Sequence, residues 1–381
     1  MKEKQTKKLV LMFLRSLEIG GAQTHACMLA EHLKQSGEFD VQVWTFHPQG
    51  LIGEILQEKG IEIVRVPEIG NGIAAKVWGL LRLVRMARKA RPTILVPLCD
   101  YPNKLWGAIW EFTGARACVW NQLDEGREIT GKFLEKRSLK RSSVFVANSE
   151  EGKKFLKQRF KIQDHRIRII YNGIHLEKEE LDRPGWRKRL GVPENAFLAV
   201  MVANYTKFKD HPTLLKAWRI VVQRLPKENP PILVLVGNLR LTESSLRTQA
   251  ADLGLADSVV FFGQVKDLSG LLHACDLGVF SSKHEGMPYA VLDCMLARIP
   301  IVATGITGIR EALGAHYPYL VPPDDPEQLA EQILARISAP QHDGEWVEAN
   351  YQRVTRLFSP EAMGKNYEAL FAELLGDRSS R

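Results

Sequence analysis

The chain has 381 residues, of which 45% are hydrophobic and 25% charged, a composition typical of a soluble globular protein with two domains. No apolar run approaches the roughly 18 residues needed to cross a bilayer, which excludes an integral membrane protein. The five cysteines are scattered and form no Cys-x-x-Cys pair, which argues against a zinc ribbon or a dithiol motif and predicts a reducing, cytoplasmic compartment. The net charge of +8 favours anionic partners.

Short apolar segments alternate with helical patterns in the first half of the chain. The run 9–14 is too short for the apolar part of a signal peptide, and we expect it to be the first buried strand. Residues 22–33 follow with the apolar spacing of an amphipathic helix. Such alternation predicts a doubly wound parallel sheet. The strands expected in this domain are residues 9–14, 41–46, 61–66, 94–98, 117–120 and 144–147.

The pattern breaks at residues 174–186, a charged stretch that contains Pro184 and Gly185 and that we expect to link two domains. Further strands are expected at residues 197–203, 232–236, 259–262, 277–280, 301–303 and 319–321. The fold class is therefore α/β, with two Rossmann-like doubly wound domains facing across a cleft, residues 1–178 and 179–358. The last helix, at about 359–381, is expected to pack back on the first domain. Sheets of this kind bind ligands at the carboxyl ends of their strands.

The loop after the first strand contains Gly20, Gly21 and Ala22. Paired glycines let a backbone turn tightly and approach a ligand closely. The helix that follows adds free amides and a partial positive charge, which favour phosphate. Because neither a Gly-x-Gly-x-x-Gly motif nor a Walker lysine is present, the motif leaves both a phosphate site and a plain turn open.

A second polar loop follows the strand at 277–280. Pro288 suits the first position of a helix, because it lacks an amide that would be unpaired there. Glu285 would then precede this helix, and Asp293 would share a helix face with Tyr289, four residues earlier. Carboxylates suit sugar and ribose hydroxyls, and backbone amides suit a diphosphate. From spacing alone, a capped helix with two solvated acids is the favoured interpretation.

The longer phrase HEGMPYAVLDCMLARIPIVATGITGIREAL, residues 284–313, resembles the donor-binding signature of the retaining family 4 glycosyltransferases, the glycosyl transferases group 1. Other stretches resemble the same family over most of the chain: IGGAQ (19–23), FVANSEEGKKFL (145–156), IRIIYNGI (167–174), VANYTKFKDHPTLLKAW (202–218), LVLVGN (233–238) and VVFFGQV (259–265). The resemblance implies the GT-B fold. It also implies hexosyl transfer from a UDP- or GDP-sugar to a saccharide or lipid-linked acceptor, in polysaccharide or glycolipid biosynthesis, with no cofactor besides the donor.

The resemblance also implies roles for individual residues. Glu285 would bind the transferred sugar, and Lys209 would neutralise the leaving diphosphate, because a fixed cation stabilises charge that grows as the glycosidic bond breaks. Asp293 would hold the ribose, where the family usually has the longer Glu. The other implied donor contacts are Gly20, Gly21, Ala22, Asn204, Gln264 and Val265, together with Gly286, Met287, Pro288 and Tyr289 through their backbone.

Two positions depart from the family pattern. An Arg is usual where Asn204 or Tyr205 stands here. A His is usual after the fifth strand, where this chain has Asn121, which can hydrogen-bond a sugar hydroxyl but cannot carry a proton. Asn121 is thus the catalytic residue that the resemblance implies on the acceptor side, with Asp124 and Glu125 nearby as alternative bases.

The chain contains no Asp-x-Asp triplet, the motif with which the other major glycosyltransferase fold holds a divalent metal, so no metal is expected to be required. Two basic stretches of the first domain, 82–89 and 132–141, favour contact with a lipid-linked acceptor or with the anionic inner face of the cell membrane. Ordinary solvated helix faces are the alternative. No aromatic-interleaved basic motif is present, so nucleic acid is not an expected partner.

Other functions are compatible with these motifs. Loss of the usual Arg and His is consistent with a non-catalytic nucleotide-sugar-binding protein. A nucleotide-sugar 2-epimerase has the same two-domain fold. A dinucleotide-dependent dehydrogenase is not expected, because no Gly-x-Gly-x-x-Gly follows the first strand.

Overall fold

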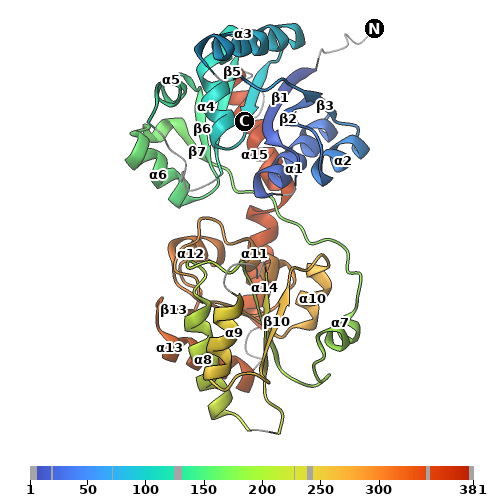
Figure 1. The fold of residues 1–381 in the computed structure, drawn as a ribbon, viewed down its shortest axis with the longest axis vertical. Helices are drawn as coiled ribbons and strands as arrows, with labels where there is room; N and C mark the ends of the chain where they lie inside the picture. The colour runs from blue at the N-terminus through green and yellow to red at the C-terminus, as the bar shows by residue number, and fades with distance from the viewer. Residues whose placement is uncertain are drawn as a thin grey trace. The chain divides into compact units, whose positions relative to one another are not determined.

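The computed structural model describes residues 7–18, 20–70, 72–123, 131–226, 228–237, 243–339 and 344–376. Its contacts divide the chain into two compact units (Figure 1). Unit 1 comprises residues 1–173 and 359–381, and unit 2 comprises residues 174–358. Each unit has one parallel sheet, of seven strands in unit 1 and six in unit 2. The expectation of two doubly wound α/β sheets is therefore confirmed.

The sheet of unit 1 has the strand order β3-β2-β1-β4-β5-β6-β7. Its strands are β1 (Lys8–Ser16), β2 (Phe39–His47), β3 (Glu62–Arg65), β4 (Ile94–Pro97), β5 (Ala117–Gln122), β6 (Val144–Ala147) and β7 (Ile167–Ile169). The apolar run of β1 is continuous because both faces of the sheet are covered. Val10 and Met12 lie in one core cluster, and Leu11 and Phe13 in another on the opposite face.

The helices of unit 1 cover both faces of its sheet. They are α1 (Gly21–Gln35), α2 (Leu51–Glu58), α3 (Ile73–Ala90), α4 (Asp100–Ile109), α5 (Phe133–Arg141), α6 (Glu150–Phe160) and α15 (Pro360–Leu375), with short 3-10 turns η1 (Trp110–Phe112) and η2 (Asp164–Arg166). Helix α15 packs on α1. The two come so close that a Cβ on Gly364 would lie 2.1 Å from the ring of His32, which only a glycine permits.

The sheet of unit 2 has the order β10-β9-β8-β11-β12-β13. Its strands are β8 (Leu198–Val202), β9 (Ile232–Val236), β10 (Val259–Gly263), β11 (Leu277–Phe280), β12 (Ile301–Thr304) and β13 (Leu320–Val321). Every residue of β9, β11 and β12 is buried. The helices are α7 (Arg183–Leu190), α8 (His211–Arg224), α9 (Glu243–Asp252), α10 (Leu268–Ala274), α11 (Tyr289–Leu296), α12 (Thr307–Leu313), α13 (Pro326–Ser338) and α14 (Gly344–Leu357).

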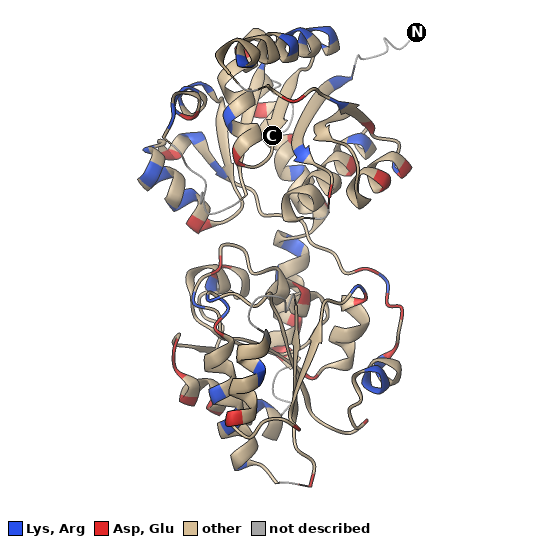
Figure 2. Cartoon of the chain, viewed as in Figure 1, with Lys and Arg blue, Asp and Glu red and all other residues tan. Residues whose placement is uncertain are grey.

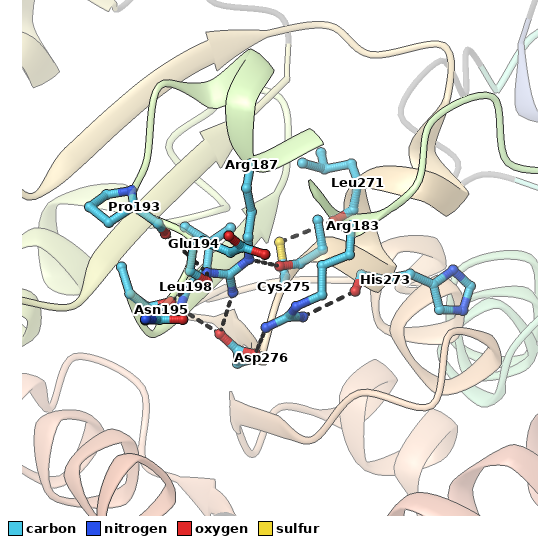
Figure 3. Close-up of polar contacts among 12 residues, drawn as sticks. Arg183, Arg187, Pro193, Glu194, Asn195, Leu198, Leu271, His273, Cys275 and Asp276 are labelled. Carbon is cyan, nitrogen blue, oxygen red and sulfur yellow. Dashed lines mark hydrogen bonds and ion pairs between the residues drawn. The ribbon is translucent and has the colours of Figure 1, made fainter. Parts of the chain in front are cut away.

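A buried arginine anchors α7 to the amino ends of two central strands (Figure 3). The Arg187 guanidinium donates to the carbonyl oxygens of Glu194 at 2.6 Å and Ala196 at 2.7 Å, and to the Asp276 carboxylate at 2.9 Å. The same carboxylate oxygen accepts the Leu198 amide at 2.8 Å. Because Asp276 precedes β11 and Leu198 begins β8, Arg187 fixes these two strands side by side.

The predicted linker differs from the structure in one respect. Asp182 caps a helix, α7, which begins within the charged stretch that we expected to link the two domains. Trp186 in this helix is fully buried, and its indole donates to Asp267 at 2.7 Å. Charge dominates the local composition here, so a single buried tryptophan and arginine do not show in the pattern. None of the helices within the described ranges has the length and apolar composition needed to cross a membrane.

Candidate functional site

The order of strands in unit 2 identifies the place where a ligand is expected. Strand β8 lies between β9 and β11, so successive connections leave it in opposite directions. Open parallel sheets bind ligands outside the carboxyl ends of their strands at such a switch point. The loop 203–210 follows β8 and the loop 281–288 follows β11, so both emerge there. These loops contain Lys209 and Glu285.

The two predicted charged residues of these loops are in contact. The Lys209 ammonium group forms an ion pair with the Glu285 carboxylate. The Ser282 hydroxyl donates to the same carboxylate oxygen at 2.7 Å. The Glu285 side chain is 11% exposed and the Lys209 side chain 26%, so the pair is largely shielded from bulk water and still partly accessible. Attraction between charges is stronger in such a site than on an open surface.

Further hydrogen bonds hold the two loops against each other. The Ser281 hydroxyl donates to the carbonyl oxygens of Lys209 at 3.1 Å and Asp210 at 2.9 Å. The Lys283 amide donates to the carbonyl oxygen of Phe208 at 2.7 Å. Asp210 has a left-handed backbone, φ 48°, which turns the chain from this loop into α8. The position of Lys209 is thus set by backbone contacts and does not depend on its ion pair alone.

The segment between Glu285 and α11 presents unpaired backbone amides. The N–H groups of Gly286, Met287 and Ala290 form no hydrogen bond with any described residue. The prediction of four adjacent amide donors is wrong in detail, because Pro288 has none and the Tyr289 amide donates to the carbonyl of Met287 at 3.1 Å. Helix α11 begins at Tyr289, one residue later than expected. Unpaired amides at a helix start are suited to an anion.

Gly308, at the start of α12, lies directly against this segment. A Cβ at this position would lie 2.4 Å from the carbonyl oxygen of Glu285 and 2.6 Å from that of Gly286. Only glycine permits this approach, because both neighbours are backbone atoms. The Thr304 hydroxyl at the end of β12 donates to the carbonyl of Ser282 at 2.5 Å. Strand β12 and helix α12 therefore support the loop that carries Glu285.

Asp293 lies on α11, one turn beyond these amides, and is partly buried. Burial raises the pKa of its carboxyl group to about 7. Its side chain forms no hydrogen bond or ion pair with a described residue. A partly desolvated carboxylate without a partner can gain hydrogen bonds from the hydroxyls of a ligand.

The other predicted donor contacts of unit 2 follow neighbouring strands. Asn204 is exposed in the loop after β8, and Gln264 is exposed directly after β10, with Val265 partly exposed beside it. Gly237 brings the loop after β9 close to the loop after β8, since a Cβ on it would lie 2.1 Å from the carbonyl oxygen of Ala203. Gln264 and Val265 are at the carboxyl edge of the sheet, two strands away from β8.

The predicted glycine loop belongs to unit 1, at the carboxyl end of β1. Here β1 lies between β2 and β4, so this loop is also at a switch point. Gly20 has an extended backbone, φ −175°, that any residue can adopt, so the expected tight glycine turn is not formed. A Cβ on Gly21 would meet no atom within 4 Å, and Ala22 is in the first turn of α1. Gly21 thus leaves open space, whereas a Cβ on Gly20 would lie 2.5 Å from the Gln23 side chain.

Asn121 does not lie where the sequence suggested. It is fully buried within β5, and its amide group donates to the carbonyl oxygens of Pro97 and Val119, each at 2.9 Å. Its amide oxygen accepts the Tyr367 hydroxyl of α15 at 2.6 Å. The predicted contact between Asn121 and a sugar is therefore corrected, because internal partners occupy the whole side chain. Asp124 and Glu125 lie outside the described residues.

Tyr367 connects Asn121 to a second buried polar residue. His25 of α1 lies 3.2 Å from the Tyr367 hydroxyl through its Nε2 atom, and burial lowers the pKa of His25 to about 4. Because the hydroxyl proton is directed to Asn121, the neutral His25 must donate from Nε2. This chain of hydrogen bonds ties α1, β5 and α15 together in the interior of unit 1.

Sequence reasoning did not identify the residues that support the site. Ser281 and Ser282 stand in the quoted loop, and Gly308 in the Gly-rich turn, but their contacts depend on which strands are adjacent. Among the described residues, no group of three or more His, Cys, Asp or Glu side chains is placed to hold a metal ion. The assembled group of unit 2 consists of one cation, two carboxylates and three unpaired amides. Together they offer donors for an anion and acceptors for hydroxyl groups.

Known proteins resemble this chain over both units. Residues 182–353 match the family model of the glycosyl transferases group 1, and residues 19–178 match that of glycosyltransferase family 4. One curated relative is the UDP-Gal:alpha-D-GlcNAc-diphosphoundecaprenol alpha-1,3-galactosyltransferase of Escherichia coli, 24% identical over 46% of each chain. Another is the putative teichuronic acid biosynthesis glycosyltransferase TuaC of Bacillus subtilis, 29% identical over 62% of this chain and 56% of that protein. The chain thus spans about half the length of the curated relatives it matches.

Solved structures agree with this family at the level of the fold. A glycosyltransferase from Rickettsia africae has a TM-score of 0.80 at 18% identity, covering 98% of this chain and 100% of its own. Anabaena Alr3699/HepE in complex with UDP and glucose has a TM-score of 0.76 at 20% identity, covering 95% and 99%. Two family models in series and the shared pair of Rossmann-like sheets lead to one conclusion: the chain belongs to the glycosyl transferases group 1, the family 4 glycosyltransferases, and has their GT-B fold.

Proposed function

We propose that this protein is a retaining glycosyltransferase that moves a hexosyl group from a nucleotide sugar to a hydroxyl of a saccharide or lipid-linked acceptor. In this proposal unit 2 binds the donor, unit 1 binds the acceptor, and the enzyme works in the cytoplasm in polysaccharide or glycolipid biosynthesis. The observation that carries the proposal is the Lys209–Glu285 pair beside the unpaired amides of Gly286 and Met287, at the switch point of a nucleotide-binding type of sheet.

Each group of this site suits one part of a nucleotide sugar. The diphosphate would accept hydrogen bonds from the amides of Gly286, Met287 and Ala290 and would attract the Lys209 ammonium group. Glu285 would then accept hydrogen bonds from hydroxyls of the transferred sugar. Asp293 would accept from the ribose diol, which replaces the hydrogen bonds that its carboxylate lacks in the free protein. Asn204, Gln264 and Val265 would border the nucleoside.

The chemical step follows from this placement. The acceptor oxygen forms a bond to the anomeric carbon while the bond from that carbon to the phosphate oxygen breaks. The acceptor proton passes to the departing diphosphate, so the step needs no histidine at the position of Asn121. Negative charge that grows on the diphosphate is stabilised by Lys209 and the amides, which are in place before the reaction.

The activities of relatives suggest which donors to test first. The Escherichia coli relative is a UDP-galactose-dependent galactosyltransferase that acts on a diphosphoundecaprenol-linked sugar. HepE is described in complex with UDP-glucose. UDP-glucose and UDP-galactose are thus the first candidate donors, with GDP-sugars as the comparison, and an undecaprenyl diphosphate-linked saccharide is the first candidate acceptor.

The experiment is a thermal-shift screen of the purified chain against UDP, GDP, ADP and their sugars, followed by a transfer assay with the donor that binds. A ligand that binds only the folded state raises the melting temperature. Transfer should be lost in Lys209→Ala and Glu285→Ala and retained in Lys216→Ala, an exposed lysine of α8. The proposal is wrong if the intact, folded chain transfers sugar from none of these donors.

The same assays separate the two alternatives. A non-catalytic binding protein would give a thermal shift with a nucleotide sugar but neither transfer nor donor hydrolysis. A 2-epimerase would release an epimerised sugar when no acceptor is present.

A further inference from the structure

Large apolar side chains reach the surface in only one part of the described structure. All nine exposed large hydrophobic residues belong to unit 1, and none of the described residues of unit 2 is among them. Seven of the nine lie on α3, η1 and α5. Apolar groups gathered on one surface mark an interaction site, whereas scattered single ones do not.

Helix α3 has an outward face that is apolar in its first half and basic in its second. Ile73 is 86% exposed, Trp78 67% and Val77 50%. At 100° per residue, these three side chains lie on the same half of the helix as Arg82 and Arg85, which are also exposed. The opposite side, with Leu83 and Ala87, is buried against the sheet. The exposed apolar groups are therefore not part of the core.

The turn η1 connects this face to α5. Arg88 of α3 donates to the carbonyl oxygen of Phe112 at 2.7 Å, and the Phe112 ring is 50% exposed. The Arg137 guanidinium of α5 lies over the same ring at 5.8 Å. Phe133, at the start of α5, is 77% exposed. We call the exposed side chains of α3, η1 and α5 the α3–α5 surface.

The charges of this surface are mainly positive: among its exposed described residues Glu111 of η1 is the acidic one, and it is paired with Arg141 of α5 at 2.8 Å. Between Glu68 and Asp100 the sequence has six Lys or Arg residues and no Asp or Glu. Lys76, Arg82, Arg85 and Lys89 form no ion pair with any described residue. Figure 2 shows the basic residues gathered along α3 and on α5. Cations left without a partner beside exposed aromatic rings attract an anionic, partly apolar partner.

The net charge of the whole of unit 1 is also positive, whereas that of unit 2 is slightly negative. Unit 1 holds 32 of the 52 Lys and Arg residues and 22 of the 44 Asp and Glu residues, a net charge of +10. Unit 2 holds the other 20 and 22, a net charge of −2. The positive charge of the whole chain is therefore a property of the unit that carries the exposed apolar groups.

We propose that the α3–α5 surface docks on the headgroup region of an anionic lipid bilayer, with Trp78, Ile73 and Phe133 inserted among the lipids. An amphipathic helix lies in the membrane interface when apolar side chains enter the lipid and basic residues contact anionic headgroups. Tryptophan is suited to this depth, because its ring is apolar and its N–H is polar. The inference stands on the surface of unit 1 and does not depend on the proposed function.

The first test is co-sedimentation of the full chain with vesicles of phosphatidylglycerol and phosphatidylcholine, compared with vesicles of phosphatidylcholine alone. We expect binding to the anionic vesicles only, weakened when salt rises from about 0.1 to 0.5 M. In Arg82→Glu/Arg85→Glu, partition should fall at least about tenfold, since each basic residue near such a surface contributes roughly fivefold. The matched control is Lys216→Glu/Arg219→Glu, the same charge change on exposed residues of α8 in unit 2.

The second test asks whether the apolar side chains enter the lipid. Ile73→Ser/Trp78→Ser should reduce partition about tenfold or more without changing the melting temperature, because neither side chain is in the core. Lipids brominated on their chains should quench part of the tryptophan fluorescence of the bound protein. Trp78→Phe should still bind and should lose most of this quenching, since Trp78 is 67% exposed, Trp110 of η1 is only partly exposed, and four other tryptophans are fully buried.

Three results would overturn the proposal. One is equal binding to neutral and anionic vesicles. Another is unchanged vesicle binding by both double variants. The third is that Ile73→Ser/Trp78→Ser converts a dimer into a monomer with vesicle binding intact, which would make this face a contact between copies of the chain.

Discussion

The Lys209 ammonium group and the Glu285 carboxylate form an ion pair, although 76 residues separate them in the sequence. Ser281 and Ser282 hold their two loops together, so the pair is a fixed part of unit 2. Lys209→Met and Glu285→Gln should each lower kcat about 100-fold or more, as loss of a preorganised charged group commonly does. Because the two groups act together, the kcat of the double variant should be no lower than that of the less active single variant.

This cycle is measured from initial rates of transfer at saturating donor, with Lys216→Met as the control for loss of a lysine. A joint role would be contradicted if the fold-decrease in kcat of the double variant equalled the product of the two single decreases.

Asp293 predicts a dependence on pH. Its folded-state pKa is raised by burial from 3.8 to about 7, so between these values the folded protein binds more protons than the unfolded chain. Stability should therefore fall as pH rises through this window. Asp293→Asn lacks this loss and should be more stable than the parent at pH 8, by on the order of 2 kcal/mol given the partial exposure of the group.

The same carboxyl group should give donor affinity the opposite dependence. Ribose hydroxyls donate to the carboxylate, so the Kd for the donor should decrease as pH rises from 6 to 8. In Asp293→Asn, donor binding should be weaker and nearly independent of pH. Melting temperatures without ligand and calorimetric titration with the donor check the two parts separately, and a pH-independent Kd in the parent would count against the ribose contact.

Gly308 tests whether α12 supports the Glu285 loop. In Gly308→Ala the new methyl group would lie 2.4 Å from the carbonyl of Glu285, so the loop must move. We expect the KM for the donor to rise about tenfold and stability to fall by ~1–3 kcal/mol, the usual effect of overpacking. The control is Gly344→Ala, because a Cβ there meets no atom within 4 Å. Equal behaviour of the two variants would show that the contact has no effect.

Tyr367 is expected to affect stability and not the donor site. Tyr367→Phe leaves the amide oxygen of buried Asn121 without its donor, which should cost ~1–3 kcal/mol. Because these residues belong to unit 1, hydrogen exchange should accelerate in peptides of α1, β5 and α15 while the peptides of unit 2 stay unchanged. Tyr101→Phe, whose ring is 41% exposed, is the control. Unchanged exchange around β5 would mean that the hydrogen bond contributes nothing.

Most strands of both units were predictable because they are apolar runs covered on both faces of the sheet, whereas β7, with one buried residue in three, was not among the expected strands. The carboxyl end of β5 was harder to predict, and for this reason Asn121 was expected in a loop after the strand. The apolar pattern ends at Trp120, yet the strand continues to Gln122, which places Asn121 inside the sheet. Only the packing of α15, more than 240 residues away, provides the hydroxyl that makes a buried asparagine favourable there.

The residues of the candidate site could be named from the sequence, but the contacts that hold them in place could not. Glu285, Lys209 and Asp293 stand in a recognisable phrase, and their roles in donor binding stay predictions. Their supports could not be predicted, because the contacts of Ser281 with Lys209 and of Gly308 with Glu285 depend on β8, β11 and β12 being adjacent. Strand order is set by the whole sheet and is not encoded in any one loop.

Strands β8 and β11 are fixed at their amino ends by Arg187 and Asp276, and carry Lys209 and Glu285 beyond their carboxyl ends. Asp276, at the amino ends of the strands, and Asp293, on α11 beyond their carboxyl ends, should therefore affect the protein differently when mutated. Loss of Asp276 would leave a buried arginine without its counter-charge and reduce how much of the protein is folded. Loss of Asp293 removes an acceptor that has no internal partner and leaves the fold intact. In the proposed enzyme, lowering the temperature would restore activity to the first variant, whereas the second would keep its weaker donor binding at any temperature.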